Sequence, residues 1–319
     1  MLINLKELLE RIKDEKQKFP LNSLYGLSHL MPEEMALFRE AWPEVKVERR
    51  RGIIRSLVEI AESHVGTDFS AIFRFCLGDE DEIVRVQAVE GLWEDEDLSL
   101  IGHLLHLLEN DPSSLVRAAA ATSLGRFVLL GELGEIEAAP ALKVQDALFR
   151  AIQDEHETLE VQRRAVESIA YSGGAEVIDI IEEAYSHEDE KMRVSAVFAM
   201  GRNLDPCWNK FLLRELDSPN PEMRYEAACA CGEMENPDAV PHLARLVARD
   251  PDPEVKEAAI WALGSIGGEE ARRILTEISA SEDESLREAA IEALENLDFS
   301  SDMPLYEFYS DFYDEYFDE

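Results

Sequence analysis

The chain has 319 residues with 31 basic and 68 acidic side chains, which gives a net charge of −37 at pH 7. Such a negative field repels phosphate backbones and argues against direct nucleic-acid binding. The sequence also has no apolar run near the roughly 20 residues that a membrane-spanning helix needs. Its four cysteines are Cys76, Cys207, Cys229 and Cys231. Since Cys229 and Cys231 point to different sides of one helix, they do not suit a shared zinc ion, and we expect free thiols in a reducing, cytoplasmic compartment.

Residues 1–67 are predicted to form an N-terminal helical capping region. The amphipathic helix expected over 1–18 is interrupted by charged side chains, which argues against a signal peptide and favours a cap on the end of the fold. Further helices are expected over 32–42 and 45–64. The repeat described next fits here poorly, because its first apolar position would fall on Arg49, so we expect one degenerate helix pair.

From residue 68 a pattern recurs seven times, with spacings of 31 or 32 residues and one of 45. Its first apolar position, called here the reference position, is Val84, Val116, Val161, Met192, Met223, Val255 and Leu286. Three residues earlier stands an N-cap residue type, namely Asp81, Ser113, Thr158, Asp189, Asn220, Asp252 and Asp283. Four residues after each reference stands an alanine, namely Ala88, Ala120, Ala165, Ala196, Ala227, Ala259 and Ala290. A fixed period of this length is typical of a solenoid.

The stretch 252–264 is the clearest copy of this unit and predicts one helix. Asp252 is an N-cap whose carboxylate accepts free N–H groups of the first turn. Val255, Ala259 and Leu263 recur every four residues and form one apolar line, in which the small alanine lets a neighbouring helix come close. Gly264 is expected to end the helix in a left-handed conformation.

Each period also has room for a second helix with apolar residues at helical spacing. These helices are expected over 68–77, 100–108, 144–152, 177–184, 209–216, 239–247 and 271–278. The sequence therefore predicts an all-α fold, an α-solenoid of stacked antiparallel helix pairs over 68–297. The motif Asp-x-x-(Val/Met/Leu)-Arg-x-x-Ala-x-x-x-Leu-Gly resembles the short bacterial type of HEAT repeat, the PBS-lyase HEAT-like repeat. That resemblance implies a HEAT-like superhelix and a family of many adaptors and a few enzymes.

The long interval of 45 residues reflects an insertion near 126–140. Its apolar run, Phe127 to Leu130, is expected to lengthen the helix, with Gly131 and Gly134 ending it. Insertions in solenoids often sit on a binding face. A tolerated surface loop is the alternative, although the apolar content favours packing.

Residues 298–319 are predicted to leave the helical period and form an acidic, aromatic C-terminal tail. Its aromatic residues include Tyr309, Phe312, Tyr313 and Tyr316, set among acids without a basic residue. A purely solvating tail would have few aromatics, so we expect a segment that docks on a basic, apolar surface. Docking on the chain itself or on another copy is favoured over docking on another protein.

The sequence offers no catalytic, cofactor-binding or metal-binding motif. The HEAT-repeat oxygenase deoxyhypusine hydroxylase has His-Glu pairs just after the repeat arginine, and no histidine stands at those positions here. His156-Glu157 and His187-Glu188 are expected to be turn residues. Phosphate-binding glycine loops and His-Glu-x-x-His are also missing. The expectation is a protein that is not an enzyme.

Basic residues follow the reference position in most repeats, as at Arg117 and Lys256. They are expected to pair with acidic turns, Arg117 with Asp111 and Lys256 with Asp250, and so to tie repeats together. Irregular residues near the ends of the repeat helices are the candidates for partner binding, since exposed Trp, Tyr and Arg dominate interfaces. They are Trp93, Arg126, Tyr171, Arg202, Asn203, Trp208, Tyr225 and Trp261. The competing interpretation, favoured for the set as a whole, is structural: Trp93 and Trp261 fill gaps between repeats.

We therefore expect a cytoplasmic, bacterial, non-catalytic scaffold or adaptor that binds protein through the concave face and the tail. One alternative is a lyase-like or accessory protein that holds a chromophore or small ligand in the groove. A second is an acidic mimic of nucleic acid that binds a basic protein. The expected partners are proteins, without direct nucleic-acid or membrane binding. The chain is expected to be a monomer or to self-associate through its tail.

Overall fold

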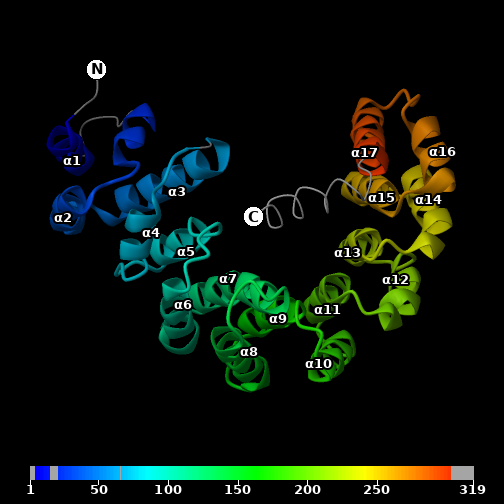
Figure 1. Cartoon of the computed structure of the whole chain (residues 1–319), viewed down its shortest axis with the longest axis horizontal. Coiled ribbons are helices and arrows are strands. Elements are labelled where there is room, and N and C mark those ends of the chain that lie inside the picture. Colours follow the sequence, from blue (N-terminus) through cyan, green and yellow to red (C-terminus); the bar gives the residue numbers. More distant parts are fainter. Residues whose placement is uncertain (1–3, 15–20, 65, 303–319) are drawn as a thin grey trace, which may run out of the picture. The chain divides into compact units, whose positions relative to one another are not determined.

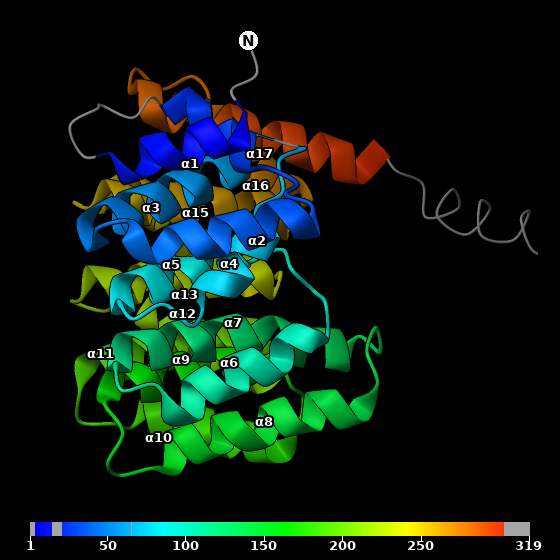
Figure 2. The ribbon, with the colours of Figure 1, turned by 90° about the vertical axis from the view of Figure 1, so that its left-hand side faces the viewer.

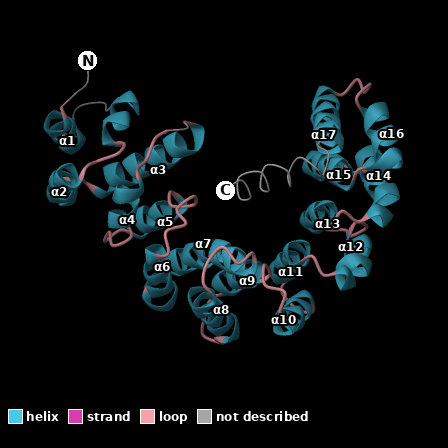
Figure 3. Ribbon diagram, viewed as in Figure 1, coloured by secondary structure: helices cyan, strands magenta, loops and turns pink. Residues whose placement is uncertain are grey.

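The computed structural model describes residues 4–14, 21–64 and 66–302. Every regular element within these ranges is a helix, and the predicted all-α solenoid of antiparallel helix pairs is confirmed (Figure 3). The chain divides into two compact units, residues 1–172 and 173–319, called here unit 1 and unit 2. The boundaries expected at residues 67 and 297 stay predictions.

Unit 1 begins with the N-terminal helices and continues into three repeats (Figure 1). Its elements are α1 (Leu5–Lys13), η1 (Leu21–Leu27), α2 (Pro32–Ala41), η2 (Trp42–Glu44), α3 (Val47–Ser63), α4 (Ser70–Cys76), α5 (Glu82–Glu90), α6 (Ser99–Asn110), α7 (Ser114–Glu132), α8 (Ala138–Gln153) and α9 (Leu159–Ile169).

Unit 2 holds four repeats. Its elements are α10 (Ala175–Tyr185), α11 (Glu190–Asn203), η3 (Pro206–Trp208), α12 (Asn209–Glu215), α13 (Pro221–Glu233), η4 (Pro237–Ala239), α14 (Val240–Arg249), α15 (Pro253–Ile266), α16 (Gly268–Ile278) and α17 (Glu284–Asp302). The second helices expected from the sequence are all present, at α4, α6, α8, α10, α12, α14 and α16.

The helices that carry the repeat motif form one layer within each unit. In unit 1, α3, α5, α7 and α9 pack on one another in that order, and α4, α6 and α8 each pack on the motif helix that follows (Figure 2). In unit 2, α11, α13, α15 and α17 form the same series, with α10, α12, α14 and α16 beside them. Each motif helix therefore presents one side to its second helix and leaves the opposite side open.

The apolar line of the motif lies in the core, as predicted. The alanine four residues after the reference is fully buried in all seven repeats, and the reference residues from Val84 to Val255 are buried. Leu286 in the last repeat is half-buried. A fully buried Val or Leu side chain contributes about 1.5–3 kcal/mol, so the line that specifies the repeat also holds the layers together.

The motif glycine does not end its helix, which corrects the expectation for Gly264. α15 continues past Gly264 to Ile266, and the left-handed residue is Gly267, with φ +68°. A Cβ at Gly264 would lie 3.0 Å from the Cβ of Ala293 on α17, and one at Gly232 would lie 2.9 Å from the Cα of Ala262 on α15. The glycine is needed because adjacent motif helices approach closely there.

The insertion lengthens α7 as expected. Phe127 and Val128 are fully buried, and the helix ends at Glu132, followed by Gly134 at φ +74°. One predicted helix boundary was wrong, because the first helix spans Leu5–Lys13 rather than 1–18. The last helix, α17, is helical through Asp302.

The cation after the reference position joins two turns, and the structure changes its predicted partners. Arg117 donates through Nη1 to the carbonyl oxygen of Asp111, whereas its carboxylate partner is Glu157, at 2.7 Å and 2.8 Å. Asp250 is bound by Arg224 rather than by Lys256, at 2.6 Å and 2.8 Å. Arg85, Arg117 and Arg224 each donate to a carbonyl oxygen in the turn before their own helix and bind a carboxylate in the turn before the next motif helix.

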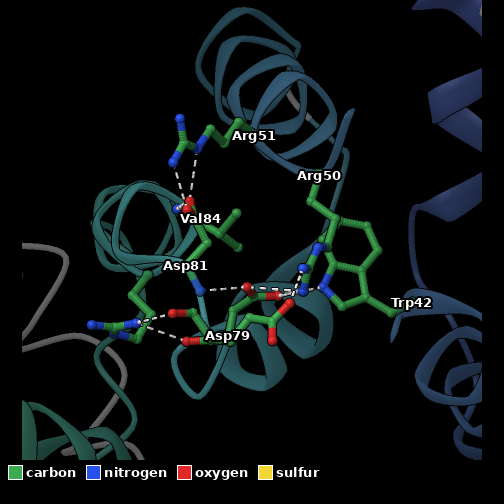
Figure 4. A network of polar contacts seen from close by, with 8 residues as sticks. Trp42, Arg50, Arg51, Asp79, Asp81 and Val84 are labelled. Atoms are coloured by element: carbon green, nitrogen blue, oxygen red, sulfur yellow. Dashed lines mark hydrogen bonds and ion pairs between the residues drawn. The ribbon is translucent and has the colours of Figure 1, made fainter. Parts of the chain in front are cut away.

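Arginine–carboxylate pairs also join the N-terminal region to the first repeat (Figure 4). Arg50 donates to both carboxylate oxygens of Asp79, at 2.9 Å and 3.1 Å, and the Nε1–H of Trp42 donates to Asp79 at 2.7 Å. Arg51 binds the carboxylate of Asp81, which also accepts from the backbone N–H of Val84. Arg49 thus occupies a reference position, and α3 behaves as the motif helix of a degenerate repeat, as expected.

Candidate binding grooves

Each unit has a groove on the open side of its motif helices. The core line uses the reference position and those four and eight residues later. The grooves are lined from positions between these, such as six residues after the reference, at Glu90, Thr122, Cys229 and Trp261, and ten residues after it, at Arg126, Arg202 and Glu233. The two grooves are therefore equivalent features of the repeat whose chemistry differs.

The unit-1 groove has a volume of about 600 Å³ and a largely apolar wall. Its apolar residues come from α5, α7 and the turn after α5, namely Ile83, Val86, Val89, Trp93, Leu115 and Ala118. The side chains of Trp93 and Leu115 are 55% and 51% exposed. Large apolar side chains this exposed, gathered at one concave site, are typical of a binding surface.

Arg126 is the distinctive charged group of the unit-1 groove. Its Nη1 donates to the backbone carbonyl oxygens of Leu92, at 2.5 Å, and Trp93. Its Nε and Nη2 atoms are buried without a hydrogen-bond partner within the described residues. Burial lowers the pKa of this guanidinium, because desolvation disfavours the charged form.

The remaining charged groups of this groove are arranged differently. Arg164 pairs with Glu160 at 2.9 Å and with Glu167 at 2.8 Å. Burial raises the pKa of Glu90 above its usual range, and the neighbouring Glu62 adds to that shift. Of the two arginines, Arg164 is thus already neutralised by carboxylates, whereas Arg126 is held by neutral carbonyls.

The unit-2 groove, of about 750 Å³, combines aromatic rings with carboxylates. Phe198, Tyr225 and Trp261 line it together with four glutamates, Glu226, Glu233, Glu254 and Glu257. Tyr225 is 39% exposed and Trp261 is 45% exposed. Its cation, Arg202, pairs with Glu233 at 2.9 Å and lies over the Phe198 ring at 5.0 Å. The open part of this groove is therefore aromatic and acidic.

Cys229 lies in the unit-2 groove beside Tyr225. Burial raises the pKa of the Cys229 thiol to about 11, and the pKa of Tyr225 is raised by Cys229 and by burial. Both groups are neutral near pH 7. A thiol with a raised pKa is a weak nucleophile, so these two side chains offer polar surface rather than an activated nucleophile.

The structure brings together five of the candidates taken from the sequence. Trp93 and Arg126 line the unit-1 groove, and Arg202, Tyr225 and Trp261 line the unit-2 groove. Trp93 and Trp261 are about half exposed, and both the partner-binding and the gap-filling interpretation of them stay predictions.

The other candidates lie elsewhere. Trp208 is fully buried and donates its Nε1–H to Asn203 at 2.9 Å, so its indole supports the core and is not available to a partner. Tyr171 is half-buried and lines neither groove. The tail candidates Tyr309, Phe312, Tyr313 and Tyr316 lie outside the described residues.

Sequence reasoning missed the glutamates, Phe198 and the apolar wall of the unit-1 groove. The signal was available in the repeat itself. Once the core line is assigned, the residues two and six positions after each reference face away from it. In unit 2 most of these residues are glutamates or aromatics, whereas at the start of unit 1 they are Val86, Glu90, Ala118 and Thr122.

Two further observations concern metal and membrane. Among the described residues, no three His, Cys, Asp or Glu side chains are grouped as a metal site would require. His156-Glu157 and His187-Glu188 lie in turns, as expected, where Glu157 binds Arg117 and His187 Nδ1 accepts from the Asp189 N–H. No helix in the described part of the chain is long and apolar enough to cross a bilayer.

Comparison with known proteins gives relatives of two kinds. Deoxyhypusine hydroxylase of Candida albicans is 24% identical over 250 residues, which cover 71% of this chain and 78% of that protein. The bilin biosynthesis protein PecE of Mastigocladus laminosus is 32% identical over 128 residues, 38% of this chain and 48% of that protein. The expectation of a chain without catalysis was wrong, because relatives over most of its length are named as an enzyme.

Solved structures agree on the fold. The complex of CpcE and CpcF of phycocyanin lyase from Nostoc sp. PCC7120 aligns over 90% of this chain and 96% of that chain, with a TM-score of 0.53 and 18% identity. The family model for HEAT repeats matches residues 71–147 and 209–295, together just over half of the chain. With its motif, its helix pairs and this match, the chain belongs to the HEAT-repeat family.

Proposed function

We propose that this HEAT-repeat scaffold binds a basic segment of a partner protein in the unit-2 groove, in a cytoplasmic setting. The observation that carries the proposal is that Tyr225 and Trp261, both substantially exposed, line one groove with four glutamates. This is the more specific form of the basic-partner alternative that the acidic composition suggests.

The aromatic rings supply the first part of the recognition. A Lys or Arg side chain over the face of Trp or Tyr gains about 0.5–1 kcal/mol at an exposed site and about 2 when desolvated. Trp and Tyr also lose little conformational entropy on binding and dominate interface energetics. Trp261 and Tyr225 come from neighbouring motif helices, α15 and α13, which hold the rings on rigid elements.

The carboxylates supply the second part. Glu254 and Glu257 make no ion pair with a basic residue of the described chain, and Glu257 accepts only from the Ser285 hydroxyl, at 2.8 Å. The groove's own cation, Arg202, is already paired with Glu233. An incoming cation would therefore meet uncompensated negative charge, which favours encounter and selects against acidic partners.

The relatives named as enzymes also favour an enzymatic role for this chain. In an enzyme, the unit-2 groove would select the protein substrate by binding its basic segment. In a scaffold, the same groove would bind the partner protein.

The test measures the affinity of the full chain for a fluorescent peptide of alternating lysine and alanine by anisotropy. Trp261→Ala should weaken binding about tenfold, as expected for a loss of about 1.4 kcal/mol at an anchor. The double variant Glu254→Gln, Glu257→Gln should weaken it and reduce its salt dependence.

A matched control separates the groove from the general charge of the chain. Glu269 and Glu282 are exposed glutamates of unit 2 outside the groove, and their double change to Gln removes the same charge. If this control lowers the affinity as much as the groove variant, or if Trp261→Ala has no effect, binding is non-specific and the proposal fails.

A further inference from the structure

The unit-1 groove differs from the unit-2 groove in a way that points to another ligand. Arg126 and Arg202 stand at the same position of their repeats, ten residues after Val116 and Met192. Arg202 pairs with Glu233, which stands ten residues after the next reference. The corresponding residue after Arg126 is Tyr171, so the repeat supplies no carboxylate there.

Arg126 consequently remains without a carboxylate partner in the described structure. Only backbone carbonyls accept from its Nη1, and Nε and Nη2 are buried with no acceptor. Asp95 and Glu96 act on Arg126 only through their charge, and Asp95 is bound by Arg74 through two hydrogen bonds of 2.8 Å. A desolvated cation held this way is costly, and an anion placed beside it would recover part of that cost.

The wall next to Arg126 limits what such an anion is attached to. Val86, Val89, Leu115 and Ala118 present apolar surface, with the exposed Trp93 ring at the same end as Arg126. A peptide backbone against this wall would leave N–H and C=O groups unsatisfied, whereas an alkyl or aryl body would not. The volume of about 600 Å³ lies within the range of small-molecule sites.

We propose that the unit-1 groove binds a small amphiphilic carboxylate, with its apolar body against α5 and α7 and its carboxylate beside Arg126. This site is separate from the basic-peptide site proposed for unit 2. The proposal of a carboxylate site does not depend on whether the unit-2 groove binds a basic peptide.

The experiment uses dansyl-undecanoate as the probe and its uncharged methyl ester as the matched control ligand. Energy transfer from tryptophan to dansyl reports binding to the full chain, and Trp93→Phe identifies the transfer from this groove. The carboxylate should bind more tightly than the ester. Arg126→Met should weaken the carboxylate about tenfold, as expected for loss of a hydrogen bond to a charged group, and leave the ester unchanged.

Two control variants distinguish binding in the unit-1 groove from binding elsewhere on the chain. Ala119→Phe fills the groove from α7 and leaves Arg126 in the sequence, and it should abolish binding of both ligands. Arg150→Met removes an exposed arginine of unit 1 outside the groove and should change neither. Circular dichroism melts of each variant establish that the fold is retained.

Several outcomes would overturn the inference. Equal affinity for carboxylate and ester, equal loss in Arg126→Met and Arg150→Met, or unchanged binding in Ala119→Phe would each do so. A peptide with the sequence of residues 305–319 that displaces the probe and binds more tightly would assign the groove to the acidic, aromatic tail instead of to a small molecule.

Discussion

Arg85 and Asp111 join two successive repeats through a buried pair: Nε and Nη2 of the arginine each donate to one carboxylate oxygen at 2.8 Å. The Nη1 of Arg85 also donates to the carbonyl oxygen of Asp79 at 2.8 Å, in the turn before its own helix. One guanidinium thus fixes the spacing of two turns. Because Arg117 and Arg224 repeat this geometry at Glu157 and Asp250, the contact is part of the repeat and not a local feature.

We expect Arg85→Ala to destabilise the fold by about 3 kcal/mol, because it leaves the Asp111 carboxylate, with only 5% of its side chain exposed, without its counter-charge. Arg193 is the matched control. Ser218 stands where the next turn would carry the acid, and the nearest carboxylate, Glu190, is 4.0 Å away. Arg193→Ala should cost less than about 1 kcal/mol. Urea unfolding of both variants measures this, and equal losses would contradict it.

The sequence predicts the solenoid well because the information is periodic. The reference residue, the buried alanine and the N-cap recur in every repeat. A helix that is assigned wrongly in one repeat can therefore be corrected by comparison with the other repeats. Gly264 was misread for a physical reason: a glycine near a helix end favours a C-cap, while a glycine facing another helix permits close approach. Only the position of the next helix separates the two.

The grooves are predicted less well, because they depend on neighbours that are far apart in sequence. Trp93 and Arg126 are visible as irregular residues, but their meeting depends on a contact between α7 and the end of α5. Trp208 is equally irregular and lies in the core. Irregularity alone therefore does not distinguish a binding residue from a buried one. The carboxylate partners predicted for Arg117 and Lys256 were likewise wrong, because Arg117 and Arg224 reach forward to Glu157 and Asp250 in the next turn.

Asp81 is expected to make stability depend on pH. Hydrogen bonds from Arg51 hold the pKa of this carboxyl below its usual range; burial acts in the opposite direction, and the Val84 N–H adds to the lowering. A carboxyl with a lowered folded-state pKa stabilises the fold above its unfolded pKa of about 4, and this contribution is lost as the pH falls through the folded pKa.

Asp81→Asn tests this dependence, since asparagine keeps the N-cap and loses the charge. The variant should be less stable than the parent by about 1 kcal/mol at pH 7. That difference should shrink when both are unfolded in urea at successively lower pH below about 4. A difference that stays constant down to acid pH would show that the ion pair with Arg51 is not its source.

Gly232 on α13 is the position where packing and the unit-2 groove meet. A Cβ there would lie 2.7 Å from Cζ3 of Trp261 and 2.9 Å from the backbone Cα of Ala262. Gly232→Ala should therefore force α13 and α15 apart and cost about 1–3 kcal/mol. Gly102 on α6 is the control, because a Cβ there meets no atom within 4 Å. Gly102→Ala should stabilise the helix by about 0.5–1 kcal/mol.

The same substitution at Gly232 should also affect binding in the unit-2 groove. Since the indole of Trp261 must move, Gly232→Ala should lower the affinity for the lysine peptide, whereas Gly102→Ala should not. Urea unfolding and peptide anisotropy on the same two variants give both readings, and a Gly232→Ala chain as stable as Gly102→Ala with unchanged peptide affinity would refute the close-approach role of this glycine.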